Sequence, residues 1–191
     1  MAARPSPDDA VLDGARRAFE RHGWEAATMD RIAAEAGVSR MTLHRRGVTR
    51  ASLLEALAER LEHEHRDAMY AGLAAPGNAR ERLHLALEGE CGVAEKNLAL
   101  MEALSAGARA AVFHEEGDEV LTRDAFTEPL QRLLTDGAAD GSLREVDVPE
   151  TATVLINLVG YTYRHLRHGH GWPPERAQRA VVSLVMEGLA A

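Results

Sequence analysis

Arginines near the N-terminus are the residues of this chain whose type and spacing best fit a specific chemistry. Four of them fall in a stretch that holds no acidic residue between Glu35 and Glu55. They are Arg40, Arg45, Arg46 and Arg50. A guanidinium group binds phosphate oxygens and can donate two hydrogen bonds to a guanine edge in the major groove. The cluster therefore indicates binding to nucleic acid.

The charge of the chain agrees with such a partner once it is divided along the sequence. The 191 residues carry a formal net charge of −8, but residues 1–50 hold nine arginines and seven acidic residues, which leaves −10 for the remainder. Charges more than about 8–10 Å away are screened at physiological salt, so the local charge governs steering toward phosphates. The first fifty residues are basic within an acidic chain.

Two short helices joined by a glycine turn are predicted to position these arginines. Thr28 is a preferred N-cap for a helix over 29–36, and Ser39 for a helix over 40–46. Gly37 supplies the positive φ of the sharp turn between them. Apolar side chains are expected to point inward and fix the crossing of the two helices. They are Ile32, Val38 and Leu43.

The second of these helices is predicted to read double-stranded DNA. An α-helix fits the major groove, where the first residues of a recognition helix meet base edges. Helix N-termini also attract phosphate through their free N–H groups. The two capping residues, Thr28 and Ser39, are therefore included among the predicted DNA contacts. The predicted DNA-binding residues are Thr28, Ser39, Arg40, Met41, Thr42, His44, Arg45, Arg46 and Arg50.

A gapless series of positions in about the first sixty residues carries a family resemblance. The positions are Ala15, Phe19, Gly23, Trp24, Thr28, Ile32, Ala33, Ala36, Gly37, Val38, Ser39, Thr42, Leu43 and Leu53. Through them the segment closely resembles the N-terminal domain of the TetR family of repressors. The resemblance implies a palindromic operator and a variable helical domain whose last two helices form a dimeric four-helix bundle. It also implies release of DNA when a small molecule enters that domain.

Three positions depart from the family's pattern. His44, Gly47 and Arg50 stand where the family usually has a tyrosine, an aromatic residue and a lysine. His44 can still donate to phosphate, and Arg50 keeps the positive charge. Gly47 removes a large apolar anchor, so a less rigid motif is expected. The alternative function is therefore a helical interaction or small-molecule-binding protein with lost or weakened DNA binding.

The rest of the chain is also predicted to be helical. Aromatic residues make up only 4% of the sequence, and no stretch alternates like a strand. After a long helix over 50–73, further helices are predicted near 79–89, 93–107, 119–139, 149–168 and 174–189. The prediction is an all-α protein of about nine helices. Its helix-turn-helix domain covers 1–50, extended to about 60 by the linking helix, and a ligand-binding and dimerisation domain covers 51–191.

The last two predicted helices are expected to form a homodimer interface. Both are apolar over most of their circumference, which requires burial on two sides. Twofold dimers are the commonest oligomers, and a single large core is the alternative explanation. The predicted interface residues are Leu155, Val159, Val181 and Val185.

The segment 79–130 is expected to enclose a ligand site. Its apolar pattern is uneven and interrupted by glycines, which suits a cavity better than a filled core. The candidate lining residues are Leu87, Cys91, Met101, Leu104, Phe113, Phe126 and Tyr161. They include no lysine or arginine, so the expected effector is a small, mostly hydrophobic and neutral molecule.

Other chemistries find less support in the sequence. His165, His168 and His170 could hold a metal, but histidines near a helix C-terminus also complement its dipole. The single cysteine, Cys91, is more often a small buried apolar residue than a redox sensor. We therefore predict no metal, no cofactor and no catalytic residues. No apolar stretch is long enough to span a bilayer and no signal peptide is evident, so a cytoplasmic location is expected.

Overall fold

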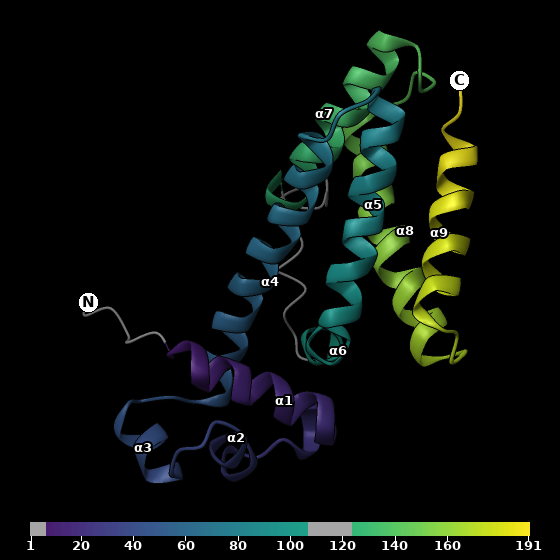
Figure 1. Cartoon of the computed structure of the whole chain (residues 1–191). Helices are drawn as coiled ribbons and strands as arrows, with labels where there is room; N and C mark the ends of the chain where they lie inside the picture. The colour runs from purple at the N-terminus through teal and green to yellow at the C-terminus, as the bar shows by residue number, and fades with distance from the viewer. Residues whose placement is uncertain (1–6, 107–123) are drawn as a thin grey trace. The chain divides into compact units, whose positions relative to one another are not determined.

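The computed structural model describes residues 7–106 and 124–191, and this part of the chain contains nine α-helices and no strand (Figure 1). The helices are α1 (Asp9–Ala26), α2 (Met29–Glu35), α3 (Arg40–Arg45), α4 (Arg50–Leu73), α5 (Ala79–Lys96), α6 (Leu98–Ala106), α7 (Asp124–Asp140), α8 (Val148–His168) and α9 (Pro174–Gly188). The predicted all-α class is confirmed.

The helices divide into two compact units. The described part of the first unit is 7–61 with 97–106, and that of the second is 62–96 with 124–191. The helix α4 begins in the first unit and ends in the second. The helix α6 packs against α1 and belongs to the first unit, a long-range contact that local sequence patterns do not reveal.

The helix α1 presents one apolar face to the first unit. Asp8 caps its start by accepting a hydrogen bond from the amide of Val11 at 3.0 Å. Gly23, with φ of 71°, interrupts the helix near its end, where the sequence predicts a stop. The rings of Phe19 and Trp24 meet edge to face at 5.2 Å between centroids. The buried face consists of Val11, Leu12, Gly14, Ala15, Ala18 and Phe19.

The end of α2 forms the predicted glycine turn. Gly37 has φ of 67°, and its amide donates to the carbonyl of Ala34 at 3.2 Å. The amide of Val38 donates to the carbonyl of Ala33 at 3.0 Å. These two bonds make a Schellman motif, the helix ending in which glycine takes the left-handed position. Val38 is half-buried, so it covers the turn less completely than predicted.

The end of α3 repeats the same motif around Gly47. Gly47 has φ of 67° and donates to His44 at 3.0 Å, and the amide of Val48 donates to Leu43 at 3.0 Å. Val48 and Leu43, which this hydrogen bond links, are both buried, as the Schellman motif favours for these two positions. The expectation that Gly47 loosens the motif is therefore revised. Gly47 suits the cap, and Val48 supplies a buried apolar side chain one residue later.

The helix α5 is continuous where the sequence predicts a break between 89 and 93. Gly89 remains helical and lies against α4, where a Cβ on it would be 3.3 Å from the Cβ of Ala68. The prediction was wrong because the glycine serves close packing of two helices and does not end one. The break falls instead at Asn97, between α5 and α6. Of the predicted helix over 119–139, residues 119–123 lie outside the described part.

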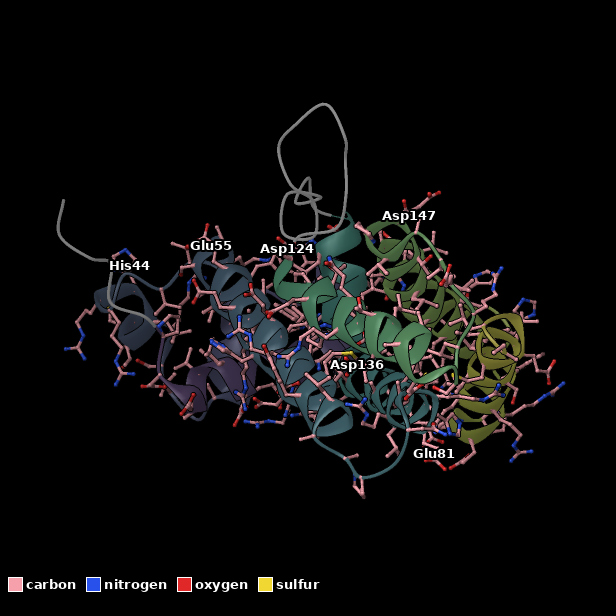
Figure 2. All side chains as sticks on the ribbon, turned by 90° about the horizontal axis from the view of Figure 1, so that it is seen from above. His44, Glu55, Glu81, Asp124, Asp136 and Asp147 are labelled. Atoms are coloured by element: carbon pink, nitrogen blue, oxygen red, sulfur yellow. The ribbon has the colours of Figure 1, made fainter. Side chains whose placement is uncertain are left out.

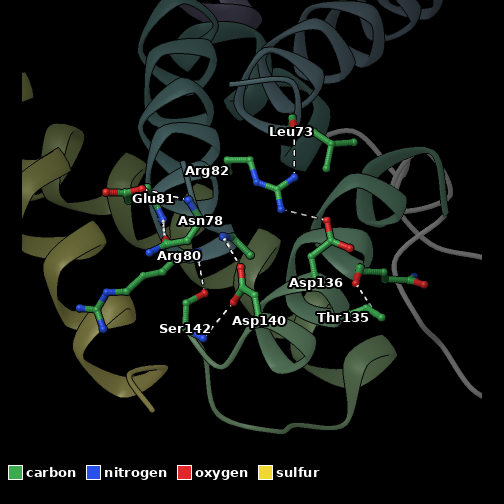
Figure 3. Close-up of polar contacts among 11 residues, drawn as sticks. Leu73, Asn78, Arg80, Glu81, Arg82, Thr135, Asp136, Asp140 and Ser142 are labelled. Atoms are coloured by element: carbon green, nitrogen blue, oxygen red, sulfur yellow. Dashed lines mark hydrogen bonds and ion pairs between the residues drawn. The ribbon is translucent and has the colours of Figure 1, made fainter. Parts of the chain in front are cut away.

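In the second unit α5 contacts α7, α8 and α9, so it lies at the centre of the packing. Its first turn is fixed by a capping box (Figure 3). Asn78 accepts from the amide of Glu81 at 3.0 Å, and Glu81 accepts from the amide of Asn78 at 2.9 Å. Asp140 of α7 accepts from the first amide of α5 at 2.9 Å, and Arg82 pairs with Asp136 at 3.0 Å. The start of α5 is thereby tied to the end of α7.

Replacing Gly47 with alanine is expected to lower the free energy of unfolding by about 1–2 kcal/mol, the usual cost of a left-handed L-residue. No atom lies within 4 Å of a Cβ built there, so the cost is conformational. Gly92, inside α5 and equally open, is the matched control. Alanine at Gly92 should raise stability by about 0.5–1 kcal/mol. Unfolding followed by circular dichroism measures both, and shifts of the same sign would contradict the assigned cap.

Candidate nucleic-acid interface

The helix α3 is six residues long and is held at both ends and through one buried side chain. Ser39 caps its start, with its hydroxyl accepting from the amide of Thr42 at 3.1 Å. Leu43 is fully buried against the rest of the domain. Figure 2 shows His44 on the outside of the helix. The exposed residues of α3 and its C-cap are Arg40, Met41, His44, Arg45 and Arg46, all of them predicted DNA-binding residues.

Two of the exposed arginines are paired with carboxylates of the same domain. Nη1 of Arg40 lies 2.8 Å from Oδ2 of Asp30 on α2. Nη1 of Arg46 lies 2.5 Å from Oδ2 of Asp8, the residue that caps α1. Within residues 7–106 and 124–191, Arg45 forms no ion pair. Arg45 is therefore the arginine of this surface with its charge uncompensated by a neighbour.

Arg50 lies against Trp24. Its guanidinium carbon is 4.0 Å from the centre of the Trp24 ring, and Nη2 donates to the carbonyl of Trp24 at 2.6 Å. Its Nε atom is buried. Arg50 thus joins the start of α4 to the end of α1, and its predicted phosphate contact stays a prediction.

The remaining predicted residues lie at helix starts. The hydroxyl of Thr28 accepts from the amide of Arg31 at 3.4 Å and caps α2. The hydroxyl of Thr42 lies 2.9 Å from that of Ser39, so these two side chains stabilise each other at the start of α3. Both predicted N-caps are present, and α2 and α3 form a helix-turn-helix unit that contacts α1 through α2.

Comparison with known proteins gives this unit its family. Residues 11–57 match the family model of bacterial regulatory proteins, tetR family. A TetR family transcriptional regulator from Thermus thermophilus has a similar fold, with a TM-score of 0.71 at 20% identity over 96% of this chain and 100% of that chain. A TetR transcriptional regulator from Streptomyces coelicolor gives a TM-score of 0.61 at 27% identity over 95% and 97%. No curated protein matches the sequence.

The helix-turn-helix segment of the chain is thus similar to the tetR family of bacterial regulatory proteins, and the fold of the whole chain is similar to that of solved TetR-family regulators. The first unit carries the matched segment, and the second unit carries most of the remaining helices.

The residues predicted to line a ligand site are not all in the same unit of the chain. Leu87, Cys91 and Phe126 are buried in the second unit, whereas Met101 and Leu104 lie on α6 in the first. Burial raises the pKa of the Cys91 thiol to about 12. A thiol with so high a pKa is unreactive at neutral pH, which agrees with the interpretation of Cys91 as a small buried apolar residue.

Tyr161 lies on the surface of the second unit and not in its core. Its side chain is 55% exposed, and the guanidinium of Arg164 lies 4.7 Å from the centre of its ring. The buried tyrosine of α8 is Tyr163, two residues later and on the opposite side of the helix. Phe113 lies outside the described residues.

The four residues predicted for the dimer interface are buried within the single chain. Leu155, Val159, Val181 and Val185 pack into the core of the second unit, so their surfaces are already covered. A different set of apolar side chains is exposed on the same two helices. It comprises Val154, Leu158 and Tyr161 of α8 and Leu184 of α9.

A buried ion pair in the second unit was missed by the sequence analysis. Nδ1 of His65 lies 2.5 Å from Oε2 of Glu90, and Nε2 lies 3.0 Å from the carbonyl oxygen of Phe126. Burial alone would lower the pKa of His65, but the charge and hydrogen bond of Glu90 outweigh it and raise that pKa above 6.5. When the ring is protonated, both of its nitrogens donate, and His65 joins α4 to α5 and α7.

A second charged cluster joins α5 to α8. Glu95 accepts from Nε of Arg167 at 2.7 Å and from Nη2 of Arg167 at 2.8 Å, the two-pronged geometry typical of arginine with a carboxylate. Tyr163 donates to the same carboxylate at 2.9 Å. The hydrogen bonds from Arg167 hold the pKa of Glu95 below its usual value. The spacing of these residues along the chain does not indicate the cluster.

The histidines at the end of α8 lie beside aromatic side chains. The rings of His165 and His170 are 5.1 Å apart between centroids, and His170 is 6.2 Å from Trp172. In the described part of the chain, no group of three or more His, Cys, Asp or Glu side chains could hold a metal ion. No helix in the described part of the chain is long and apolar enough to cross a membrane.

Replacing Glu90 with glutamine is expected to lower the free energy of unfolding by about 3 kcal/mol near pH 6, because it leaves a buried imidazolium without its counter-ion. A raised folded-state pKa gives His65 a stabilising contribution that is fully present below its unfolded pKa of 6.5. That contribution is lost as the pH rises through the folded-state value. The difference in free energy of unfolding between wild type and Glu90→Gln, measured by urea unfolding, should therefore shrink as the pH rises.

The control for this prediction is Glu187→Gln, which removes the same charge from an exposed position on α9. Its effect on stability should be small at every pH. A Glu90→Gln effect that stays constant with pH would show that the ion pair does not titrate as described.

Proposed function

We propose that this chain is a transcriptional repressor that binds a palindromic operator as a homodimer and releases it when a small molecule binds. The observation that carries the DNA-binding part is the exposed surface of α3, with three arginines and His44 around the exposed Met41. The activity is binding, with no catalytic step. Two recognition helices about 34–36 Å apart would occupy successive major grooves of the operator.

The exposed residues of α3 divide into base-reading and phosphate-binding roles. Arg40, the first residue of the helix, lies where recognition helices meet base edges, and Met41 can contact a thymine methyl group. Arg45 and His44, in the last turn, bind phosphates, with Arg46 beside them. Thr28, the N-cap of α2, makes a further phosphate contact at the start of that helix. Arg50 supports this surface through Trp24.

The DNA-binding proposal is tested by retention of genomic fragments on the purified protein, followed by gel shifts on a retained fragment at several salt concentrations. Arg45→Ala should weaken binding to all sequences and reduce the slope of log affinity against log salt by about one. The affinity and salt slope of Arg45→Ala are compared with those of Arg50→Lys, which keeps the positive charge and removes the planar stack on Trp24. Failure of the wild type to retain DNA would favour an interaction protein without DNA binding.

The dimer is proposed to form through the exposed apolar side chains of α8 and α9. Val154, Leu158 and Tyr161 are spaced by four and then three residues, so they lie along one face of α8. Leu184, 67% exposed, adds an apolar residue from the neighbouring α9. Apolar side chains exposed together on adjacent helices commonly mark a protein interface. This set replaces the four buried residues that the sequence suggested.

Leu184→Glu is expected to convert the dimer into a folded monomer, because the new charge would oppose burial in an interface but is tolerated on a free surface. Val181→Glu is the matched control on the same helix. Its side chain is 4% exposed, so the charge would be buried in the core and the chain should unfold. Sedimentation and circular dichroism separate the two outcomes. A Leu184→Glu protein that remains dimeric would exclude this interface.

The proposed effector is a small, mostly hydrophobic and neutral molecule bound in the second unit. Leu87, Cys91 and Phe126 support this proposal, since they are buried, mostly apolar and uncharged side chains of this unit. The effector must bind the DNA-incompetent arrangement more tightly than the competent one to release the operator. A compound screen scored by thermal stabilisation and by loss of operator binding tests this part separately from DNA binding.

A further inference from the structure

The ion pair between Asp30 and Arg40 places a negative charge in a surface that must approach DNA. The carboxylate of Asp30 lies on α2, and its side chain is 62% exposed, while that of Arg40 is 68% exposed. An ion pair so exposed contributes little to folding stability. A carboxylate beside the recognition helix also repels phosphate oxygens. Its effect is therefore expected in DNA recognition and not in stability.

The geometry of the pair limits what Arg40 can do. A guanidinium carries five N–H donors in a rigid planar fork. Contact between Nη1 and Oδ2 of Asp30 at 2.8 Å occupies one donor and restrains a long side chain that otherwise has many rotamers. Among the described residues the other donors of Arg40 have no partner, so they can meet an acceptor pair such as O6 and N7 of guanine. A restrained side chain loses less conformational entropy on binding, which favours one geometry over others.

We propose that Asp30 is a specificity-determining residue that positions Arg40 for one base and disfavours its use as a general phosphate ligand. Asp30 itself does not contact the base in this scheme and acts through Arg40. The inference rests on the proposed DNA-binding function and goes beyond it by assigning discrimination to a residue outside the recognition helix.

The chain contains its own matched comparison in the pair between Asp8 and Arg46. Oδ2 of Asp8 holds Arg46 at 2.5 Å, while Oδ1 caps α1. Arg46 is the C-cap of α3, at the opposite end of the helix from Arg40. Asparagine is as good an N-cap as aspartate, so Asp8→Asn removes one negative charge beside one arginine without removing the cap. Asp30→Asn makes the same change beside Arg40.

The test compares two affinities of the full-length protein by gel shift or fluorescence anisotropy. One probe is a duplex that the wild type retains from genomic DNA, and the other is a shuffled duplex of equal length. Asp30→Asn should raise affinity for the shuffled duplex and lower the ratio of the two affinities about tenfold. Asp8→Asn should raise both affinities alike and leave the ratio near that of the wild type.

Arg40 variants separate positioning from charge. In an Arg40→Ala background, Asp30→Asn should no longer change the ratio. Arg40→Lys keeps the charge but lacks the planar fork, so it should lower the ratio even if Asp30→Asn alters folding. An Asp30→Asn ratio equal to that of Asp8→Asn would overturn the inference while leaving the proposed function in place. A wild type that binds no duplex would overturn both.

Discussion

The support of α3 is the constraint on which the rest of the interface depends, because a six-residue helix is unstable by itself. Ser39 satisfies one of the free amides of the first turn, that of Thr42, and the Schellman motif at Gly47 satisfies carbonyls at the other end. Leu43 anchors the middle of the helix in the core of the domain. With backbone and inner face fixed, the exposed side chains are presented together as one set.

Local signals allowed these supports to be predicted from the sequence. Thr28 and Ser39 are residues that prefer helix N-caps, and Gly37 takes a conformation that other residues rarely adopt. Such signals act over three or four residues, the range over which sequence and backbone geometry are directly linked. Gly47 was misinterpreted because the comparison was with the family's usual aromatic residue. Its own conformation gives the physical reason for its presence.

Contacts between distant residues could not be predicted in the same way. His65 and Glu90 are 25 residues apart and Glu95 and Arg167 are 72 apart, so nothing in their spacing links them. The orientation of α8 shows the same limit. Both Leu155 and Leu158 are apolar, but the packing of α5, α7 and α9 decides that the first is buried and the second exposed. Periodicity identified a helix with apolar residues around it without indicating which side the chain itself covers.

The ion pairs of the two units differ in solvent exposure, and this difference separates their consequences. His65 and Glu90 are buried, so breaking their contact would leave a charge in a medium that solvates it poorly. The pairs of Arg40 and Arg46 lie in water, where an ion pair adds little to folding stability and each guanidinium keeps further donors for a phosphate or base edge. Pairs of the first kind hold buried helices together, and pairs of the second kind orient side chains that still face solvent. An acidic chain can therefore hold Arg40 and Arg46 in place with its own carboxylates and still offer their remaining donors to DNA.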